Sequence, residues 1–142
     1  MNTGPCTNSR RDARSFLTLV LAVSLCGAAR AEDLTGLWAT DARNCDKVFS
    51  KTGSGYAIAK DADLYGSGFI IDGRRITTQL AKCDIKSSKQ EGATTHLIAS
   101  CATDVMLSNM QASFKIVSNE RILRVFPGGS DMEIPYERCA IK

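Results

Sequence analysis

The segment EDLTGLWATDARNC, residues 32–45, contains the only tryptophan of the chain, Trp38, which stands two residues after Gly36. Within this segment, residues 34–40 form the first candidate β-strand. The residues that follow decide whether this strand opens a barrel or serves only as a packing element.

The chain after this segment is arranged as short β-rich runs separated by turn residues. About eight strands are expected, and regular short strands of this kind are typical of a sandwich or a barrel. Because successive strands are joined as hairpins, we expect a small antiparallel up-and-down β-barrel. The other expected strands are residues 69–71, 75–81, 94–101, 112–117, 122–126 and 132–139, with shorter candidates at 47–50 and 56–59.

Turn residues indicate how these strands are connected. Asp72-Gly73 suits a two-residue hairpin turn, since both positions tolerate a positive φ. The polar residues 87–92 are expected to form a loop, and residues 118–121 a tight connection. Residues 104–110 fit either a helical turn or an extended segment.

The first 31 residues have the order of a secretory leader. Arginines precede an apolar run at residues 16–28, and Ala29-Arg30-Ala31 supplies the small residues that a signal peptidase reads. The run is too short for a retained membrane helix, which needs about 20 residues. We therefore expect Sec export to the periplasm or the outside of the cell, with cleavage after Ala31.

Two other export signals fit this leader less well. A lipoprotein signal needs a small residue before the modified cysteine, whereas Leu25 precedes Cys26. A twin-arginine signal needs Phe-Leu close after its arginine pair, whereas Phe16-Leu17 comes later than that pattern requires.

Residues 32–142 are expected to form one small domain. This domain has 14 basic and 14 acidic residues, because four of the 18 basic and one of the 15 acidic residues lie in the leader. The balanced charge leaves no basic patch to indicate nucleic acid, and a membrane span is not expected.

Four cysteines, Cys45, Cys83, Cys101 and Cys139, remain in this domain. Two disulfides are the default for an even number of cysteines in an oxidising compartment. Of the three possible connectivities we expect Cys83–Cys101, between consecutive segments, and Cys45–Cys139, between the first and last strand regions. A zinc site is not expected, because no C-x-x-C pair occurs and the single histidine, His96, lacks the spacing of a zinc ligand.

The stretch Leu34-Thr35-Gly36-Leu37-Trp38 resembles the G-x-W start of the calycin barrels, the lipocalins and avidins. It is more similar still to the first strand of the short periplasmic metalloprotease inhibitors, in which a cysteine follows soon after, as Cys45 does here. The resemblance covers about 12 residues and implies a calycin-like barrel in which Gly36 lets the backbone bend and Trp38 plugs one end.

The chain also departs from these families. Avidins stack biotin between several tryptophans, so a chain with one is not expected to bind biotin. The protease inhibitors insert a free N-terminal arm, and only Glu32-Asp33 would precede Leu34 here. Ser54-Gly55-Tyr56 is similar to a region of the periplasmic lysozyme inhibitors, which are also small disulfide-bonded barrels. These likenesses imply a fold rather than a function.

Candidates for catalysis or metal binding are few. Asp61, Asp63 and Asp72 match the first, third and twelfth positions of a calcium loop, but Tyr65 replaces the fifth ligand. His96 alternates with apolar neighbours, which predicts an outward strand position rather than a catalytic one. We expect no cofactor and no enzymatic activity.

Tyr56, Tyr65 and Phe69 surround a glycine-rich stretch and are a candidate binding rim. In the alternative interpretation, which we favour, Phe69 lies in the core and the tyrosines pack at the surface.

These observations predict an exported, non-enzymatic binding module. A protein partner, such as a hydrolase that the module inhibits, is favoured over a small molecule because a barrel this small is expected to be filled. The alternatives are a carrier of a small apolar ligand and an envelope protein without a ligand. A carrier would need an unfilled interior lined by Ile58, Ile76, Leu80 and Phe114.

Overall fold

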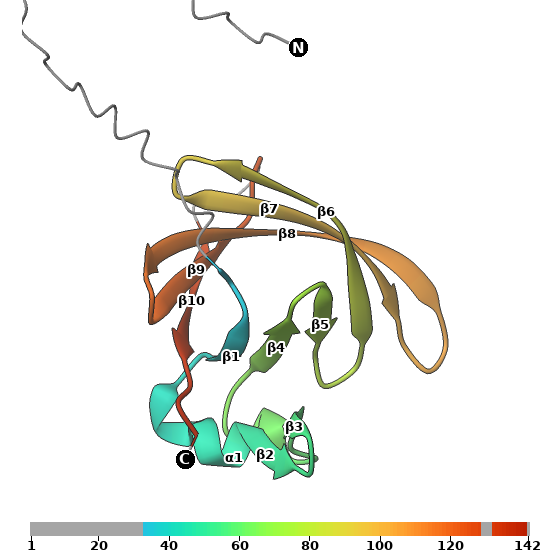
Figure 1. Ribbon diagram of the computed structural model, residues 1–142, viewed down its shortest axis with the longest axis vertical. Coiled ribbons are helices and arrows are strands. Elements are labelled where there is room, and N and C mark those ends of the chain that lie inside the picture. The colour runs from blue at the N-terminus through green and yellow to red at the C-terminus, as the bar shows by residue number, and fades with distance from the viewer. Residues whose placement is uncertain (1–32, 129–131, 142) are drawn as a thin grey trace, which may run out of the picture.

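The computed structural model describes residues 33–128 and 132–141, which form a closed antiparallel barrel of eight strands and a separate two-stranded sheet (Figure 1). This confirms the expected eight-stranded β-barrel. The barrel strands are β1 (Gly36–Ala39), β4 (Gly68–Asp72), β5 (Arg75–Thr77), β6 (Lys82–Glu91), β7 (Thr94–Ala102), β8 (Leu107–Ser118), β9 (Arg121–Val125) and β10 (Glu133–Arg138).

Strand β1 closes the barrel. The strands from β4 to β10 pair in chain order, and β1 lies between the first and the last of them. Trp38 is in register with Phe69 of β4 on one side and with Arg138 of β10 on the other. The tryptophan strand therefore joins the two ends of the meander.

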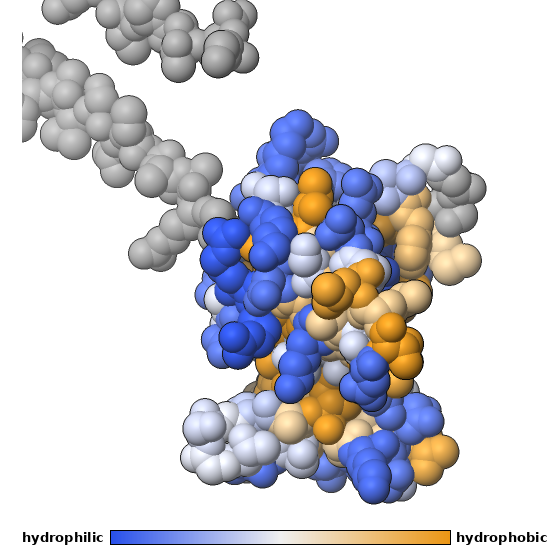
Figure 2. Space-filling view, turned by 90° about the vertical axis from the view of Figure 1, so that its right-hand side faces the viewer, coloured by the Kyte–Doolittle hydropathy of each residue, from blue (hydrophilic) through white to orange (hydrophobic). Residues whose placement is uncertain are grey.

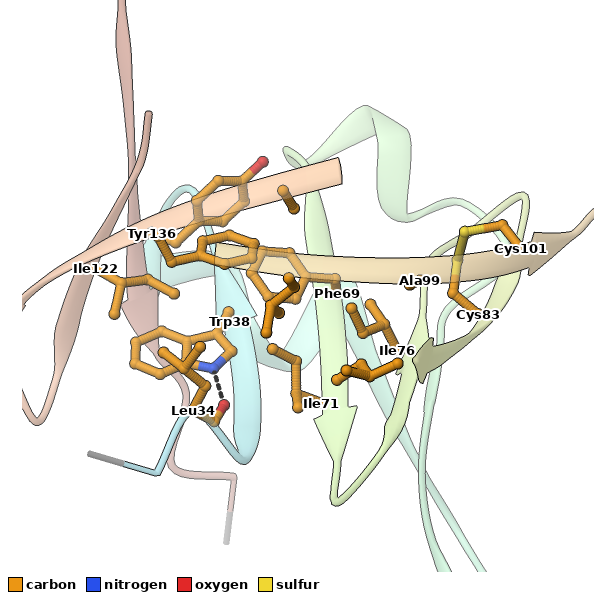
Figure 3. Close-up of a cluster of buried hydrophobic side chains, with 14 residues drawn as sticks. Leu34, Trp38, Phe69, Ile71, Ile76, Cys83, Ala99, Cys101, Ile122 and Tyr136 are labelled. Carbon is orange, nitrogen blue, oxygen red and sulfur yellow. Dashed lines mark hydrogen bonds between the residues drawn. A yellow bond between two sulfur atoms is a disulfide. The ribbon is translucent and has the colours of Figure 1, made fainter. Parts of the chain in front are cut away.

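The barrel interior is filled with apolar side chains (Figure 3). Trp38 is fully buried, and its indole Nε1 donates a hydrogen bond to the carbonyl of Leu34 at 2.8 Å. The ring of Phe69 lies 5.4 Å from that of Phe114 and 4.9 Å from that of Tyr136, measured between centroids. Such tilted and edge-on pairs are the favoured arrangements of aromatic rings.

Gly36 is required where β1 enters the barrel. Its φ is +152°, a conformation that L side chains rarely adopt, and a Cβ atom there would lie 2.5 Å from Nη1 of Arg138. Gly36 therefore leaves room for an arginine, and Trp38 fills the interior beside it.

A second layer covers the outer face of β1. Leu37 and Ala39 point away from Trp38 and pack with Val48, Phe49 and other residues of this layer. Because β1 is buried on both faces, its sequence is apolar without alternation. The layer consists of η1 (Ala42–Asn44), α1 (Cys45–Val48), β2 (Phe49–Thr52), β3 (Gly55–Ile58) and η2 (Ala62–Leu64).

Both expected disulfides are confirmed. Cys83–Cys101 joins residues directly opposite each other on β6 and β7. Cys45–Cys139 joins the start of α1 to the residue after β10. Two disulfides are consistent with a protein of the periplasm or the extracellular space.

Some expected strands and turns are wrong. Residues 47–50 are not one strand, because α1 continues to Val48 before β2 begins. Asp72 pairs with Arg75, so the two-residue turn is Gly73-Arg74, with Gly73 at a φ of +55°. The turn lies one residue later than predicted. Its first residue, Gly73, takes the positive φ, so Asp72 stays in the strand.

Two further connections were misassigned. The expected loop at 87–92 is mostly β6, whose second half is exposed on both faces and so lacks a strand's usual alternation. Strand β5 ends at Thr77, because Thr78 and Ala81 hydrogen-bond to each other across a turn. Leu80 within that turn is 81% exposed and does not line the interior.

The expected leader at 1–31 and its cleavage site lie outside the described residues. No helix among residues 33–128 and 132–141 is long and apolar enough to cross a membrane.

Candidate functional site

The three aromatic residues of the candidate binding rim do not lie together at the surface, because one of them is buried. Phe69 is 7% exposed and belongs to the barrel core, as the alternative interpretation expected. Tyr56 lies on β3, and its hydroxyl donates a hydrogen bond to the carbonyl of Ile141 at 3.1 Å. Tyr65 lies after η2 beneath the ammonium group of Lys47, 4.9 Å from the ring centroid. The tyrosines pack at the surface and stabilise the second layer.

The three aspartates of the candidate calcium loop are not brought together. Asp61 and Asp63 belong to the η2 turn, whereas Asp72 ends β4 at its far side from that turn. The described chain contains no group of three acidic, histidine or cysteine side chains arranged to hold a metal. The three aspartates of this weak calcium candidate are separated because strand β4 lies between the third and twelfth positions.

His96 lies on the outer face of β7, as its alternation predicted. Its Nδ1 lies 2.7 Å from the hydroxyl of Ser113 on β8, and its Nε2 lies 3.6 Å from the carboxylate of Glu91. The ammonium of Lys89 lies 2.5 Å from that carboxylate and holds the pKa of Glu91 below its ordinary value. Cross-strand pairing brings these groups together, since Lys89, His96 and Ser113 are opposite one another.

The Ser113–His96–Glu91 arrangement resembles a nucleophile, base and acid, but its serine lies on a strand that is paired on both sides. Ser113 lies between β7 and β9 and is paired on both sides, so the sheet uses the backbone groups around it. Acyl transfer needs N–H groups directed at the developing oxyanion. We interpret these contacts as cross-strand pairs that stabilise the sheet.

Three of the four most exposed large apolar side chains among the described residues lie on two loops at one end of the barrel, and the fourth, Leu64, lies on η2. Val105, Met106 and Leu107 form the β7–β8 tip and are 89%, 61% and 85% exposed. Leu80 lies in the β5–β6 turn. We call these four residues the apolar loop pair. Figure 2 views the side of the molecule that carries the β7–β8 hairpin, where apolar side chains gather within a hydrophilic border.

The two loops are held together at their bases. Lys82, Ala102 and Leu107 are in register across β6, β7 and β8. The Cys83–Cys101 disulfide lies one residue further into the sheet. It joins the start of β6, just after the β5–β6 turn, to the end of β7, just before the β7–β8 tip. The apolar loop pair is therefore anchored to the barrel by a covalent bond.

Thr103 braces the β7–β8 tip. Its hydroxyl accepts hydrogen bonds from the N–H groups of Val105 at 3.4 Å and Met106 at 3.2 Å. Its N–H donates to the carbonyl of Met106 at 3.0 Å. A loop held in this way loses little conformational freedom when it binds a partner.

The barrel also has a cavity of about 500 Å³ at the end near the β4–β5 hairpin. Inward side chains of Leu34, Ile71, Ile85 and Leu97 line it, together with Thr95. The guanidinium of Arg74 lies at its edge and donates to the carbonyls of Ile85 and Lys86. The interior is thus filled at its centre and open at this end.

Comparisons with protein-family models, curated proteins and solved structures find no match.

The apolar loop pair was missed from the sequence, although part of its signal is visible there. Val105-Met106-Leu107 is a run of three apolar residues next to an acidic one, Asp104. Such a run in a turn is unusual unless it has a function. The sequence did not indicate that β7 and β8 extend beyond the barrel and hold this apolar run at their tip.

Proposed function

We propose that this chain is an exported, non-enzymatic binding module whose partner is a protein, and that the apolar loop pair is its contact surface. The observation that carries the proposal is the exposure of Val105, Met106 and Leu107 on a braced, disulfide-anchored tip. Exposed apolar side chains grouped on one surface and surrounded by polar residues are typical of protein interaction sites.

The shape of this surface favours a concave partner. A tip that projects from a rigid scaffold enters a cleft, and the clefts of enzymes are concave and mainly apolar. Inhibition of a hydrolase is therefore the most specific form of the proposal. In this form the β7–β8 tip takes the role that an N-terminal arm has in the metalloprotease inhibitors that the sequence resembles.

The experiment is affinity capture from an envelope extract of the source cells, followed by binding measurements with the purified captured protein. The variants are Val105→Ser and Leu107→Ser. The matched control is Val117→Ser, which removes a 54% exposed valine from the other end of β8. We expect each tip variant to weaken binding at least about ten-fold, the equivalent of about 1.4 kcal/mol, and the control to leave it unchanged. Equal binding by all three variants would refute the proposal.

A second candidate function rests on the cavity at the barrel end. Its volume of about 500 Å³ lies within the range for small-molecule sites. Apolar side chains line its inner part, and the hydroxyl residues Thr35, Ser87, Ser88 and Thr95 are also part of its lining. The chain would then carry a small apolar ligand. Native mass spectrometry tests this, since a carrier retains a bound molecule that Leu97→Trp, which fills the cavity, displaces.

A further inference from the structure

The long strands β6, β7 and β8 extend beyond the closed part of the barrel and leave two sheet edges. On β8, pairing with β7 covers residues 107–115, whereas pairing with β9 begins only at Ser113, opposite Val125. Within the part of the chain that the structure describes, residues 107–112 pair with β7 alone. The outward backbone groups of these six residues therefore form an edge about 20 Å long.

The other edge, on β6, has the protections that sheet edges usually carry. Its pairing with β5 ends at Asp84, and the ladder shifts register between Ile85 and Ser87. The carbonyl of Arg74 accepts a hydrogen bond from the N–H of Ile85. The guanidinium of Arg74 donates to the carbonyls of Ile85 and Lys86. Lys86, Lys89 and Glu91 add charges along the strand. A bulge, a capping side chain and charges all prevent another strand from adding to an edge.

Among the residues that the structure describes, the β8 edge has none of these protections. Its sequence from 107 to 112 is LSNMQA, without a charged residue, a proline or a glycine. Its register with β7 is regular throughout. Among the described residues, no side chain hydrogen-bonds to the backbone of this stretch. The β6 edge is therefore protected against the addition of another strand, whereas the β8 edge is open to it.

The β8 edge adjoins the apolar loop pair at one end and a partly apolar cavity at the other. At its start lies Leu107 of the apolar loop pair. At its other end, where β9 turns away, a cavity of about 590 Å³ has an apolar part formed by Ile98, Phe126 and Pro127. Gln111 and the Lys89, Glu91, His96 and Ser113 side chains also line it. We call this cavity the edge groove. Gln111 points to the outer face of β8, so a residue placed opposite it would direct its side chain to the same face, beside the groove.

We propose that the protein partner binds by adding an extended segment of about six residues to the β8 edge, antiparallel to residues 107–112. The segment lies beside β8 in line with β9, on the part of the edge that β9 does not cover. It places an apolar side chain opposite Gln111, in the edge groove. Unpaired N–H and C=O groups at strand spacing are matched by another extended polypeptide. This inference rests on the proposed function and adds the mode of recognition.

A second copy of this chain fits the edge less well than an isolated segment does. If two β8 edges paired antiparallel over all six residues, Leu107 of one copy would face Ala112 of the other. Met106 would then fall opposite Ser113, a position that Val125 already occupies. An extended segment that ends freely meets no such obstruction, so it can use the whole edge.

The test begins with phage-displayed random linear peptides, selected on the full chain purified with both disulfides formed. Selected peptides are then N-methylated one residue at a time. We expect loss of binding of at least about ten-fold at alternate positions, because every second N–H of an added strand faces the sheet. Amide exchange of residues 107–112 is expected to slow in the complex.

The key variant is Asn109→Lys, which places a charge on the edge. The matched control is Ser100→Lys on β7, since Ser100 is opposite Asn109 on the same face and donates to its side chain at 3.0 Å. Both variants add one charge and remove the same hydrogen bond, but only the first lies on the edge. We expect Asn109→Lys to reduce binding of the peptides and of the captured partner about ten-fold, and Ser100→Lys to retain it.

Several results would overturn the inference. These are the absence of selected peptides, an N-methyl scan without a two-residue period, equal effects of the two lysine variants, and a dimer that Asn109→Lys abolishes. If partner capture still depends on Val105 and Leu107 in any of these cases, the proposed function stands without strand addition. Capture that is independent of both residues would refute the proposed function itself.

Discussion

The guanidinium of Arg138 lies over the indole of Trp38, with its Cζ atom 4.3 Å from the ring centroid. The same guanidinium group donates hydrogen bonds to the carbonyls of Thr35 and Asp33, which precede β1, and to that of Asn119 in the β8–β9 turn. One side chain of the last strand therefore fixes the first strand and a distant turn.

Replacing Arg138 by methionine is expected to reduce the free energy of unfolding by about 2–3 kcal/mol, because it removes a cation–π contact and several charge-assisted hydrogen bonds. Urea unfolding followed by circular dichroism measures the loss. Arg138→Lys is the control that keeps the charge. We expect it to recover less than half of the loss, since an ammonium does not reach three separate carbonyls. Full recovery by lysine would contradict the geometry described.

Gly36→Ala is expected to cost about 2 kcal/mol, because φ is positive and the new Cβ would collide with Arg138. Gly53→Ala serves as the control, since a Cβ at Gly53 meets no atom within 4 Å. Thermal unfolding of both variants beside the parent chain measures the difference. Similar melting temperatures for the two variants would show that Gly36 is not conformationally required.

The two disulfides are expected to differ in their effect on stability. Cys45–Cys139 spans 94 residues and Cys83–Cys101 spans 18. In the chain-entropy model, their removal costs about 5 and about 3 kcal/mol respectively. Paired Cys→Ser variants in denaturant unfolding measure the two losses. A larger loss from the short disulfide would indicate that its contribution comes from the anchored loops rather than from chain entropy.

The carboxyl group of Glu91 is expected to titrate below the ordinary glutamate pKa, because Lys89 stabilises its charged form by hydrogen bonding and charge. A lowered folded-state pKa adds stability above the unfolded-state pKa, and this contribution is lost as pH falls through the folded-state value. The contribution is small because both side chains are exposed. Carbon-13 NMR of Glu91 measures the pKa, which Lys89→Gln should raise and Lys89→Arg should largely preserve.

Much of the fold was predictable because its signals are local or covalent. The tryptophan strand, the disulfides and the last hairpins follow from apolar runs, cysteine positions and turn residues. Strand β6 was not predicted, because it has only two buried side chains, Cys83 and Ile85, and continues as an exposed polar strand. Its identity as a strand depends on pairing with β7, which is a non-local property.

The candidate site was less predictable than the fold for a related reason. The apolar run Val105-Met106-Leu107 has the composition of a core segment. It is exposed because β7 and β8 extend beyond the closed part of the barrel. The edge at 107–112 exists because β9 ends opposite Ser113. The sequence of β8 gives no sign of where β9 ends, so the edge could not be predicted from it. Phe69 shows the converse, since it was expected in the core under the favoured interpretation and lies there.

The position of β1 between β4 and β10 has a consequence for the order of folding. Residues 68–125 can form a meander before the barrel closes, since each of their strands pairs with its immediate neighbour along the chain. Trp38 has to wait for Arg138, and Cys45 for Cys139, which lies 94 residues later in the chain. Closure of the barrel is therefore expected after the meander has formed, at a rate limited by long-range pairing.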